Sequence, residues 1–196
     1  MKQIRITRDG GNVTFETVSI DNTENVFFTN MDPEQPHKPT ILQLVDDEEL
    51  GAFPSPNSSQ CPVPEPAAGS TEVTYGCELH EEESGVINVF PPLASANTTL
   101  TPATKGQAIG KQQVVQGGMS PYKISGQLFQ VVSVETPSSG SGSIGPGLQL
   151  TSDPTGNNGV WVIGTPTASG IYYFTFTVDD SMGRNLQQVQ YSMVVS

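Results

Sequence analysis

Three side chains that can bind a soft metal ion stand out in this sequence. Cys77 and His80 lie three residues apart in Tyr75-Gly-Cys-Glu-Leu-His80, and His37 lies about forty residues upstream. The chain has only two histidines, and both belong to this set. One thiolate and two imidazoles are the donors that copper uses in trigonal electron-transfer sites. We therefore expect His37, Cys77 and His80 to converge on one metal ion.

Short strands and turns must position these side chains. Glycine (20 residues) and proline (16 residues) are frequent in this chain of 196 residues, and apolar residues make up only 35%. This composition favours an all-β chain with many turns over one with long helices. Alternating apolar residues and turn signals predict the strands of the first half. These strands are expected at residues 2–7, 13–15, 24–29, 40–45, 72–77 and 86–90, with a long irregular loop at 50–70.

Residues 1–94 resemble a cupredoxin, the fold of the blue copper proteins. The resemblance is carried by the strand Val26-Phe-Phe-Thr-Asn-Met-Asp32, by His37, by Cys77-Glu-Leu-His80 and by Gly85-Val-Ile-Asn-Val89. It implies a Greek-key β-sandwich with one mononuclear copper, held by His37, Cys77 and His80. It also implies one-electron transfer through the edge of His80.

The fourth ligand departs from the cupredoxin pattern. Short-loop members resemble Cys-x-x-His-x-x-Met, with the Met sulfur as a weak axial ligand, but that position is Glu83 here. A carboxylate favours Cu(II) over Cu(I), so we expect a lower reduction potential and a weaker blue colour. The set of two His, one Cys and one Glu is similar to the red copper site of nitrosocyanin. Glu81 and Glu82 remain alternatives to Glu83.

A further residue is expected to orient these ligands. The resemblance implies that Asn30 ties the His37 loop to the Cys77 loop by hydrogen bonds. Cys61 offers a competing use of the thiol, because two cysteines in an exported chain can form a disulfide. A Cys61–Cys77 bridge would consume the thiolate and destroy the metal site.

Charge separates the two halves of the chain. Residues 1–94 contain sixteen acidic and four basic side chains, a net charge of −12, whereas residues 95–196 contain four of each. The acidic half makes nucleic-acid binding unexpected, because phosphate would be repelled. It could instead attract a basic redox partner protein. The alternative is a surface whose charge serves only solubility.

The second half, residues 95–196, resembles a bacterial immunoglobulin-like domain of the cadherin-like type. The matching segments are residues 106–110, 117–122, 146–150 and 159–166, together with Gly170-Ile-Tyr-Tyr-Phe-Thr-Phe-Thr-Val-Asp-Asp-Ser-Met-Gly183. This resemblance implies a second β-sandwich that spaces, docks or displays the first domain. We expect Trp161 to lie in its core.

The favoured function is electron transfer at a mononuclear copper, which makes the protein a carrier rather than an enzyme. Two alternatives remain open: a binding or adhesion protein with a vestigial copper site, and a red copper site that performs small-molecule chemistry. No apolar run is long enough to span a membrane, and the first residues do not predict a signal peptide. The cupredoxin resemblance implies a periplasmic, cell-surface or secreted protein. The oligomeric state is not predicted.

Overall fold

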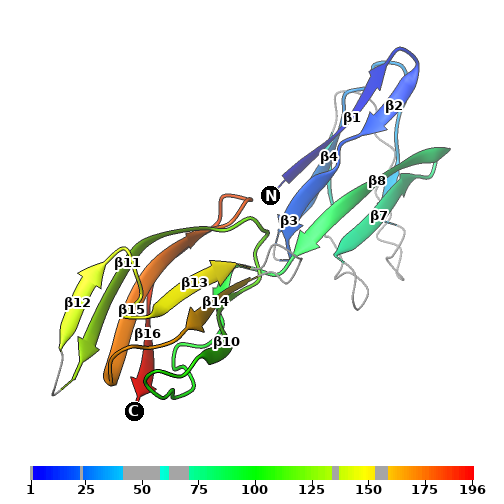
Figure 1. The fold of residues 1–196 in the computed structure, drawn as a ribbon. Coiled ribbons are helices and arrows are strands. Elements are labelled where there is room, and N and C mark those ends of the chain that lie inside the picture. The colour runs from blue at the N-terminus through cyan, green and yellow to red at the C-terminus, as the bar shows by residue number, and fades with distance from the viewer. Residues whose placement is uncertain (1, 23, 42–57, 62–70, 134–136, 153–158) are drawn as a thin grey trace. The chain divides into compact units, whose positions relative to one another are not determined.

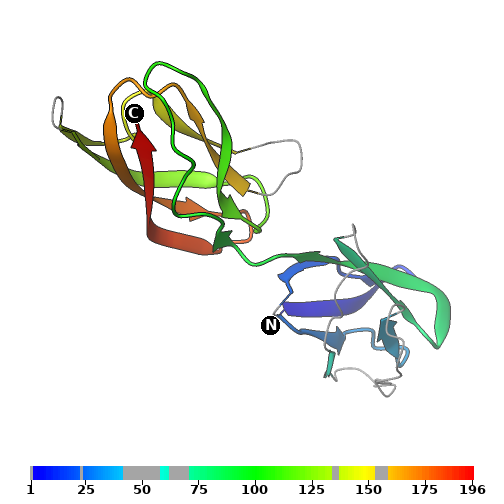
Figure 2. The same cartoon turned by 90° about the horizontal axis from the view of Figure 1, so that it is seen from below.

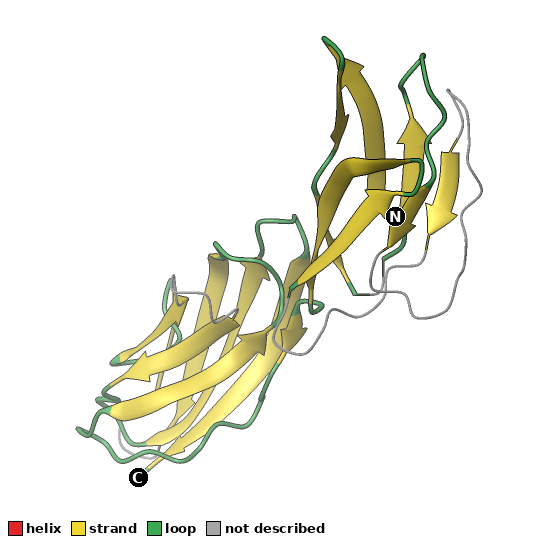
Figure 3. Ribbon diagram, turned by 90° about the vertical axis from the view of Figure 1, so that its right-hand side faces the viewer, coloured by secondary structure: helices red, strands yellow, loops and turns green. Residues whose placement is uncertain are grey.

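The structure is a computed structural model that describes the chain apart from residues 1, 23, 42–57, 62–70, 134–136 and 153–158. The described part is all-β, as expected: it contains sixteen strands and no helix (Figure 3). It divides into two compact units, Met1–Phe90 and Pro91–Ser196. No helix that could cross a membrane is found among the described residues.

Two four-stranded sheets form the first unit (Figure 1). One has the order β2-β1-β4-β6, from β1 (Lys2–Asp9), β2 (Asn12–Phe15), β4 (Val26–Asn30) and β6 (Ser58–Cys61). The other has the order β3-β8-β7-β5, from β3 (Val18–Asp21), β5 (Pro39–Ile41), β7 (Glu72–Cys77) and β8 (His80–Phe90). Both sheets are mixed, because β1 pairs parallel with β4 and β3 pairs parallel with β8.

The core of the first unit follows from alternation along its strands. Ile4 and Ile6 on β1 and Val73 and Tyr75 on β7 are fully buried. Their neighbours along the strands are more exposed, except at the end of β7, where residues 76 and 77 are buried too. Tyr75 lies opposite Gly85 on β8, where an added Cβ would clash with the tyrosine hydroxyl oxygen. Glycine at this position therefore lets the Tyr75 ring fill the core beneath the end of β7.

Two expectations for the first unit need correction. Residues 58–61 lie inside the segment predicted as an irregular loop, yet they form β6 and pair antiparallel with β4. The segment around this strand is rich in proline and serine, which predicts a loop. The strand forms because it pairs with β4, a partner far away in the sequence that no local pattern reveals. In addition, β8 begins at His80 and not near residue 86. Of the strand expected at 40–45, residues 42–45 lie outside the described part.

The second unit also has two four-stranded sheets (Figure 1 and Figure 2). One has the order β13-β14-β10-β9, from β9 (Ala94–Ser95), β10 (Ile109–Gln116), β13 (Leu148–Ser152) and β14 (Gly159–Gly164). The other has the order β12-β11-β15-β16, from β11 (Lys123–Val132), β12 (Ser138–Ser141), β15 (Gly170–Asp179) and β16 (Asn185–Val195). Residues from both sheets enter one buried apolar cluster.

Aromatic rings fill the centre of this second core. Phe174 and Phe176 each stack on Tyr191, with ring centroids 5.5 and 4.9 Å apart. Trp161, which we expected in the core, is only half-buried and lies between the fully buried Val160 and Val162. Because side chains alternate along a strand, the Trp161 ring lies on the outer face of the sheet, where the Lys111 ammonium is 5.8 Å from the ring centroid.

Candidate metal centre

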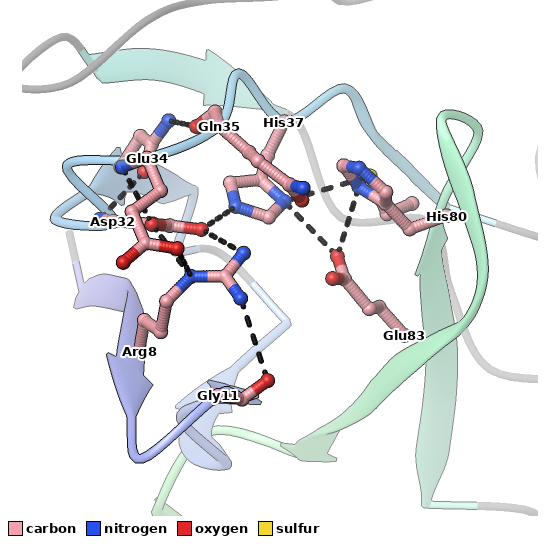
Figure 4. Close-up of polar contacts among 10 residues, drawn as sticks. Arg8, Gly11, Asp32, Glu34, Gln35, His37, His80 and Glu83 are labelled. Carbon is pink, nitrogen blue, oxygen red and sulfur yellow. Dashed lines mark hydrogen bonds and ion pairs between the residues drawn. The ribbon is translucent and has the colours of Figure 1, made fainter.

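Four side chains of the first unit place one donor atom each at a common point. His37, Cys77, His80 and Glu83 offer ligand atoms that all lie within 4.8 Å of one another. The Cys77 Sγ is 3.4 Å from His80 Nδ1 and 3.8 Å from His37 Nδ1. The Glu83 carboxylate oxygen Oε2 is 3.0 Å from His37 Nδ1 and 3.3 Å from His80 Nδ1 (Figure 4). The structure thus brings together the four residues that the sequence analysis selected.

The connection between β7 and β8 positions three of these donors. Cys77 ends β7 and pairs with His80, the first residue of β8, across a turn made by Glu78 and Leu79. The tight turn brings the two side chains to the same end of the sheet. This explains why a Cys-x-x-His spacing is sufficient to place a thiol beside an imidazole.

An irregularity in the same strand pair selects the carboxylate. The register between β7 and β8 shifts between Gly76 and Cys77, because Gly76 pairs with Ser84 while Cys77 pairs with His80. Three residues of β8 therefore bulge out opposite no partner on β7. The bulge leaves Glu81 and Glu82 exposed and turns Glu83 inward, where its side chain is 13% exposed. Among the three glutamates, the structure thus singles out Glu83.

His37 lies in the segment between β4 and β5, which connects one sheet of the first unit to the other. Its side chain is completely buried. The ring of Phe15, at the end of β2, meets the His37 ring edge-on with centroids 6.0 Å apart. Phe15 in turn packs on Tyr75, which ties the imidazole to the core. Sequence reasoning missed this support, because Phe15 is identifiable only as a strand residue.

Behind His37 lies a buried ion pair that the sequence analysis did not predict. The His37 Nε2 is 2.9 Å from the Asp32 carboxylate oxygen Oδ2, on the side of the ring away from the cluster. Arg8 donates from Nε to Asp32 Oδ1 at 2.9 Å and from Nη2 to Asp32 Oδ2 at 2.8 Å. Hydrogen bonds from Arg8 hold the pKa of Asp32 well below its usual range and outweigh the opposing effect of burial.

The loop that carries His37 is fixed by hydrogen bonds to its own backbone. The Asn30 side chain accepts from the Asp32 amide at 2.8 Å and donates to the Gln35 carbonyl at 2.9 Å. Asp32 accepts from the Glu34 amide at 2.9 Å. These bonds give the Asn-x-Asp sequence a physical role within the loop. The expected link from Asn30 to the Cys77 loop stays a prediction.

A second contact joins the two ligand segments at the surface. Lys38, next to His37, places its ammonium 2.6 Å from the carboxylate of Glu78, next to Cys77. The Thr40 hydroxyl donates to the same carboxylate at 2.6 Å, and the Glu78 amide donates to the Lys38 carbonyl at 3.0 Å. The hydrogen bond from Lys38 lowers the pKa of Glu78. The residues that follow His37 and Cys77 are thereby connected.

The thiol required for metal binding is available. Cys77 is a buried free cysteine, so the alternative of a Cys61–Cys77 disulfide is wrong. The backbone of Cys61 pairs with Val26 on the other sheet, and its side chain lies outside the described part. A pairing with β4 takes the Cys61 backbone into a different sheet from Cys77.

The spacing of the four donors fits a single first-row metal ion. Bonds of 2.0–2.3 Å to nitrogen, oxygen and sulfur place the donors of a tetrahedral site roughly 3.3–3.8 Å apart. Four of the six donor pairs are 3.0 to 3.8 Å apart, and all six lie within 4.8 Å, so small side-chain movements would bring the set to this spacing. Calcium and magnesium bind oxygen ligands, so a set with one sulfur and two nitrogens excludes them. Copper and zinc both suit these donors.

Two cavities are lined in part by residues of the cluster. One of about 480 Å³ has His80, the three glutamates, Arg8 and Gln35 among its lining residues. The other, of about 250 Å³, touches Cys77 and Glu83. Solvent-sized molecules can therefore approach the edge of the cluster without a change in the fold.

Comparisons with known proteins add little to this geometry. No protein-family model matches the chain, and no curated protein sequence matches it. One solved structure that resembles it is a Cu-containing nitrite reductase (NirK) from Thermus scotoductus SA-01, at 12% identity and a TM-score of 0.32. The match covers 100% of this chain and 61% of that protein, so this chain spans less than two thirds of its length. The immunoglobulin-like assignment of the second unit stays a prediction.

Proposed function

We propose that this protein binds one copper ion and transfers one electron at a time. The ligands are His37, Cys77 and His80, with Glu83 as the fourth donor. The observation that supports this proposal is the convergence of these four donor atoms within 4.8 Å. The buried free thiol next to two imidazoles is the donor combination that distinguishes copper electron-transfer sites from oxygen-rich sites.

Copper at such a site would supply a Cu(II)/Cu(I) couple. The protein's contribution is to hold the donors in one arrangement for both oxidation states. His37 is held by Asp32 and Phe15, and Cys77 and His80 are held by strand pairing across a tight turn. Side chains fixed in this way need little rearrangement when the charge of the site changes. Such rigidity favours rapid electron transfer.

Glu83 would tune this couple. A carboxylate oxygen is a harder donor than the thioether of methionine, and it carries a negative charge. It therefore stabilises Cu(II) relative to Cu(I). We expect a reduction potential lower than that of a site with methionine in this position, and a weaker blue colour. Replacement by methionine, Glu83→Met, should raise the potential and strengthen the blue absorption.

The first test is to reduce the full chain, load it with copper and record optical and EPR spectra. We expect an intense visible band from thiolate-to-Cu(II) charge transfer. Cys77→Ser should abolish the band, whereas the matched variant Cys61→Ser should keep it. A band that survives in Cys77→Ser would overturn the assignment. Metal analysis of the protein as isolated separates copper from zinc, which suits the same donors.

Charge and the cupredoxin resemblance suggest where the protein works and what it meets. The first unit carries the whole net charge of −12, and a negative surface attracts a basic partner and speeds encounter at low salt. The proposed partner is therefore a basic redox protein. The proposed location is the cell envelope or the exterior. Electron-transfer rates that do not depend on ionic strength would contradict the electrostatic part of this proposal.

A second candidate function is small-molecule chemistry at a red copper site. The observation that favours it is the cavity of about 480 Å³ lined by His80 and Glu83, which gives a small molecule access to the edge of the donor cluster. Addition of azide, nitric oxide or peroxide to the copper-loaded protein tests it. Altered EPR parameters would support an open metal position. Unchanged spectra would leave electron transfer as the function. A binding protein with a vestigial site would fail to bind copper at all.

A further inference from the structure

The imidazole of His37 lies between two carboxylates (Figure 4). Its Nε2 faces Asp32 Oδ2 at 2.9 Å, and its Nδ1 faces Glu83 Oε2 at 3.0 Å. A neutral imidazole has one N–H group and can donate to only one of these acceptors. The choice decides whether the Nδ1 lone pair is free to bind a metal. It therefore matters which carboxylate receives the hydrogen.

Asp32 has no hydrogen to donate. The Arg8 guanidinium donates to both of its oxygens, and the Glu34 amide donates to one of them. An ionised carboxylate only accepts hydrogen bonds. An Nε2 lone pair facing it at 2.9 Å would be repelled. The stable arrangement places the hydrogen on Nε2.

The opposite side of the ring is different. Glu83 is partly exposed, and it also contacts the Nδ1 atom of His80. A lone pair on His37 Nδ1 is also repelled by the Glu83 oxygen at 3.0 Å, but a small movement of this partly exposed side chain relieves that repulsion. The buried Asp32, held by Arg8, cannot move away in the same manner. The asymmetry between a fixed, buried anion and a partly exposed one sets the orientation of the ring.

We infer that Asp32 and Arg8 are positioning residues that hold His37 with its hydrogen on Nε2 and direct its Nδ1 lone pair into the donor cluster. The inference rests on the proposed function for its purpose, since a preset Nδ1 lone pair serves metal binding. Its geometry stands without a metal. Carboxylates that accept from a ligand histidine commonly raise metal affinity about 10–100-fold.

The second unit supplies a matched control. Asp180 is also fully buried at its side chain and paired with the fork of an arginine, Arg184. In place of an imidazole, it accepts the backbone amides of Met119, Met182 and Arg184. The substitution Asp180→Asn therefore perturbs a buried carboxylate–arginine pair without touching a histidine.

The deciding measurement is the ¹⁵N NMR spectrum of the histidine rings in the metal-free full chain, with His80→Gln used to assign His37. Spectra are recorded over a range of pH, and the tautomer is read from those in which the ring carries a single hydrogen. We expect the hydrogen on Nε2 in the wild-type protein, and a shift toward Nδ1 in Asp32→Asn, whose amide can donate to Nε2. Asp180→Asn should show the wild-type pattern. A wild-type ring with its hydrogen on Nδ1, or the same pattern in Asp32→Asn, would overturn the inference.

Copper affinity provides the second readout. Competition of Cu(II) between the protein and a chelator should show a loss of about 10–100-fold in Asp32→Asn and no change in Asp180→Asn. Equal affinity in the wild type and Asp32→Asn would contradict the positioning role. If the wild-type protein binds no copper, the proposed function fails, and the NMR result alone decides whether Asp32 sets the ring.

Discussion

Each of the two units contains a buried aspartate that forms an ion pair with an arginine, but the two aspartates have different further partners. In the second unit, the Asp180 carboxylate, at the turn after β15, accepts hydrogen bonds from the Arg184 side chain and from three backbone amides. In the first unit, the Asp32 carboxylate accepts hydrogen bonds from Arg8 and from one backbone amide, and it also faces His37 Nε2. The same ion pair thus shapes a turn in one unit and orients a side chain in the other.

The difference teaches how a structural device becomes a functional one. A buried carboxylate must have its lone pairs satisfied, because an unpaired buried charge is costly. Where backbone amides supply the partners, the result is a rigid turn. Where one partner is an imidazole, the fixed carboxylate also fixes the orientation of the ring. The first unit also directs an aromatic edge, Phe15, at the same ring, whereas the aromatic rings of the second unit stack on one another.

The largest effect is expected from a substitution that disrupts the core of the second unit and leaves the metal site unchanged. Phe174 is 1% exposed, and its ring stacks against those of Phe176 and Tyr191. Truncation in Phe174→Ala should lower the free energy of unfolding of the second unit by about 3–5 kcal/mol. The fluorescence of Trp161, the only tryptophan, follows this unit during denaturation. Copper absorption should be unchanged; loss of the copper band in the folded variant would show that the two units share stability.

Alkaline pH should weaken the second unit through Tyr122. Burial raises the pKa of Tyr122 to about 12, and the nearby Asp180 charge adds to the shift. The unfolded chain loses its phenolic proton first, near pH 10, so the stabilisation is complete below pH 10 and declines as pH rises toward 12. The loss for this group reaches up to about 2–3 kcal/mol. Urea denaturation followed by Trp161 fluorescence at pH 8 and pH 11.5 measures it.

The matched variant is Tyr122→Phe, which cannot ionise. It gives up the hydrogen bond from the Tyr122 hydroxyl to the Gly117 carbonyl, so its stability at pH 8 should be somewhat lower. Between pH 8 and pH 11.5 it should lose less stability than the wild type does. Equal losses in the two proteins would assign the alkaline effect to other groups.

Removal of each arginine sharpens the comparison between the two aspartates. Arg8→Met should weaken Cu(II) binding roughly tenfold, because Asp32 then no longer holds His37 firmly. Arg184→Met should leave copper affinity unchanged, although both variants should show a lower midpoint of thermal unfolding. Chelator competition and thermal denaturation give the two readouts. Arg8→Lys keeps the charge and should lie between Arg8→Met and the wild type.

The sequence predicted the donors of the candidate site better than their surroundings. His37, Cys77 and His80 were identifiable because histidine and cysteine are rare here, and because a turn of two residues makes Cys-x-x-His local. Glu83 could be selected only by analogy, since Glu81 and Glu82 have the same chemistry. The strand bulge that turns Glu83 inward depends on the pairing of β7 with β8, which no local pattern encodes.

The parts of the first unit that depend on distant pairing were not predicted. Arg8 lies on β1 and Asp32 follows β4, and they meet because these strands pair in parallel. From its local sequence, Arg8 would be predicted as an exposed strand residue next to a turn. β6 was missed for the same reason. In the second unit, Trp161 was expected in the core on the basis of its size, but strand alternation places Val160 and Val162 there.

The smallest expected effect concerns the surface contact between the two ligand segments. Glu78→Gln removes the ion pair with Lys38 but keeps a polar partner for Thr40 and the backbone bond to Lys38. Exposed ion pairs contribute little, because water screens both charges. Copper affinity should therefore change by less than about threefold, at low and at high salt, when it is measured beside Asp32→Asn. A tenfold loss in Glu78→Gln, with none in Asp32→Asn, would show that the surface contact orders His37 and that the buried pair behaves like its counterpart in the second unit.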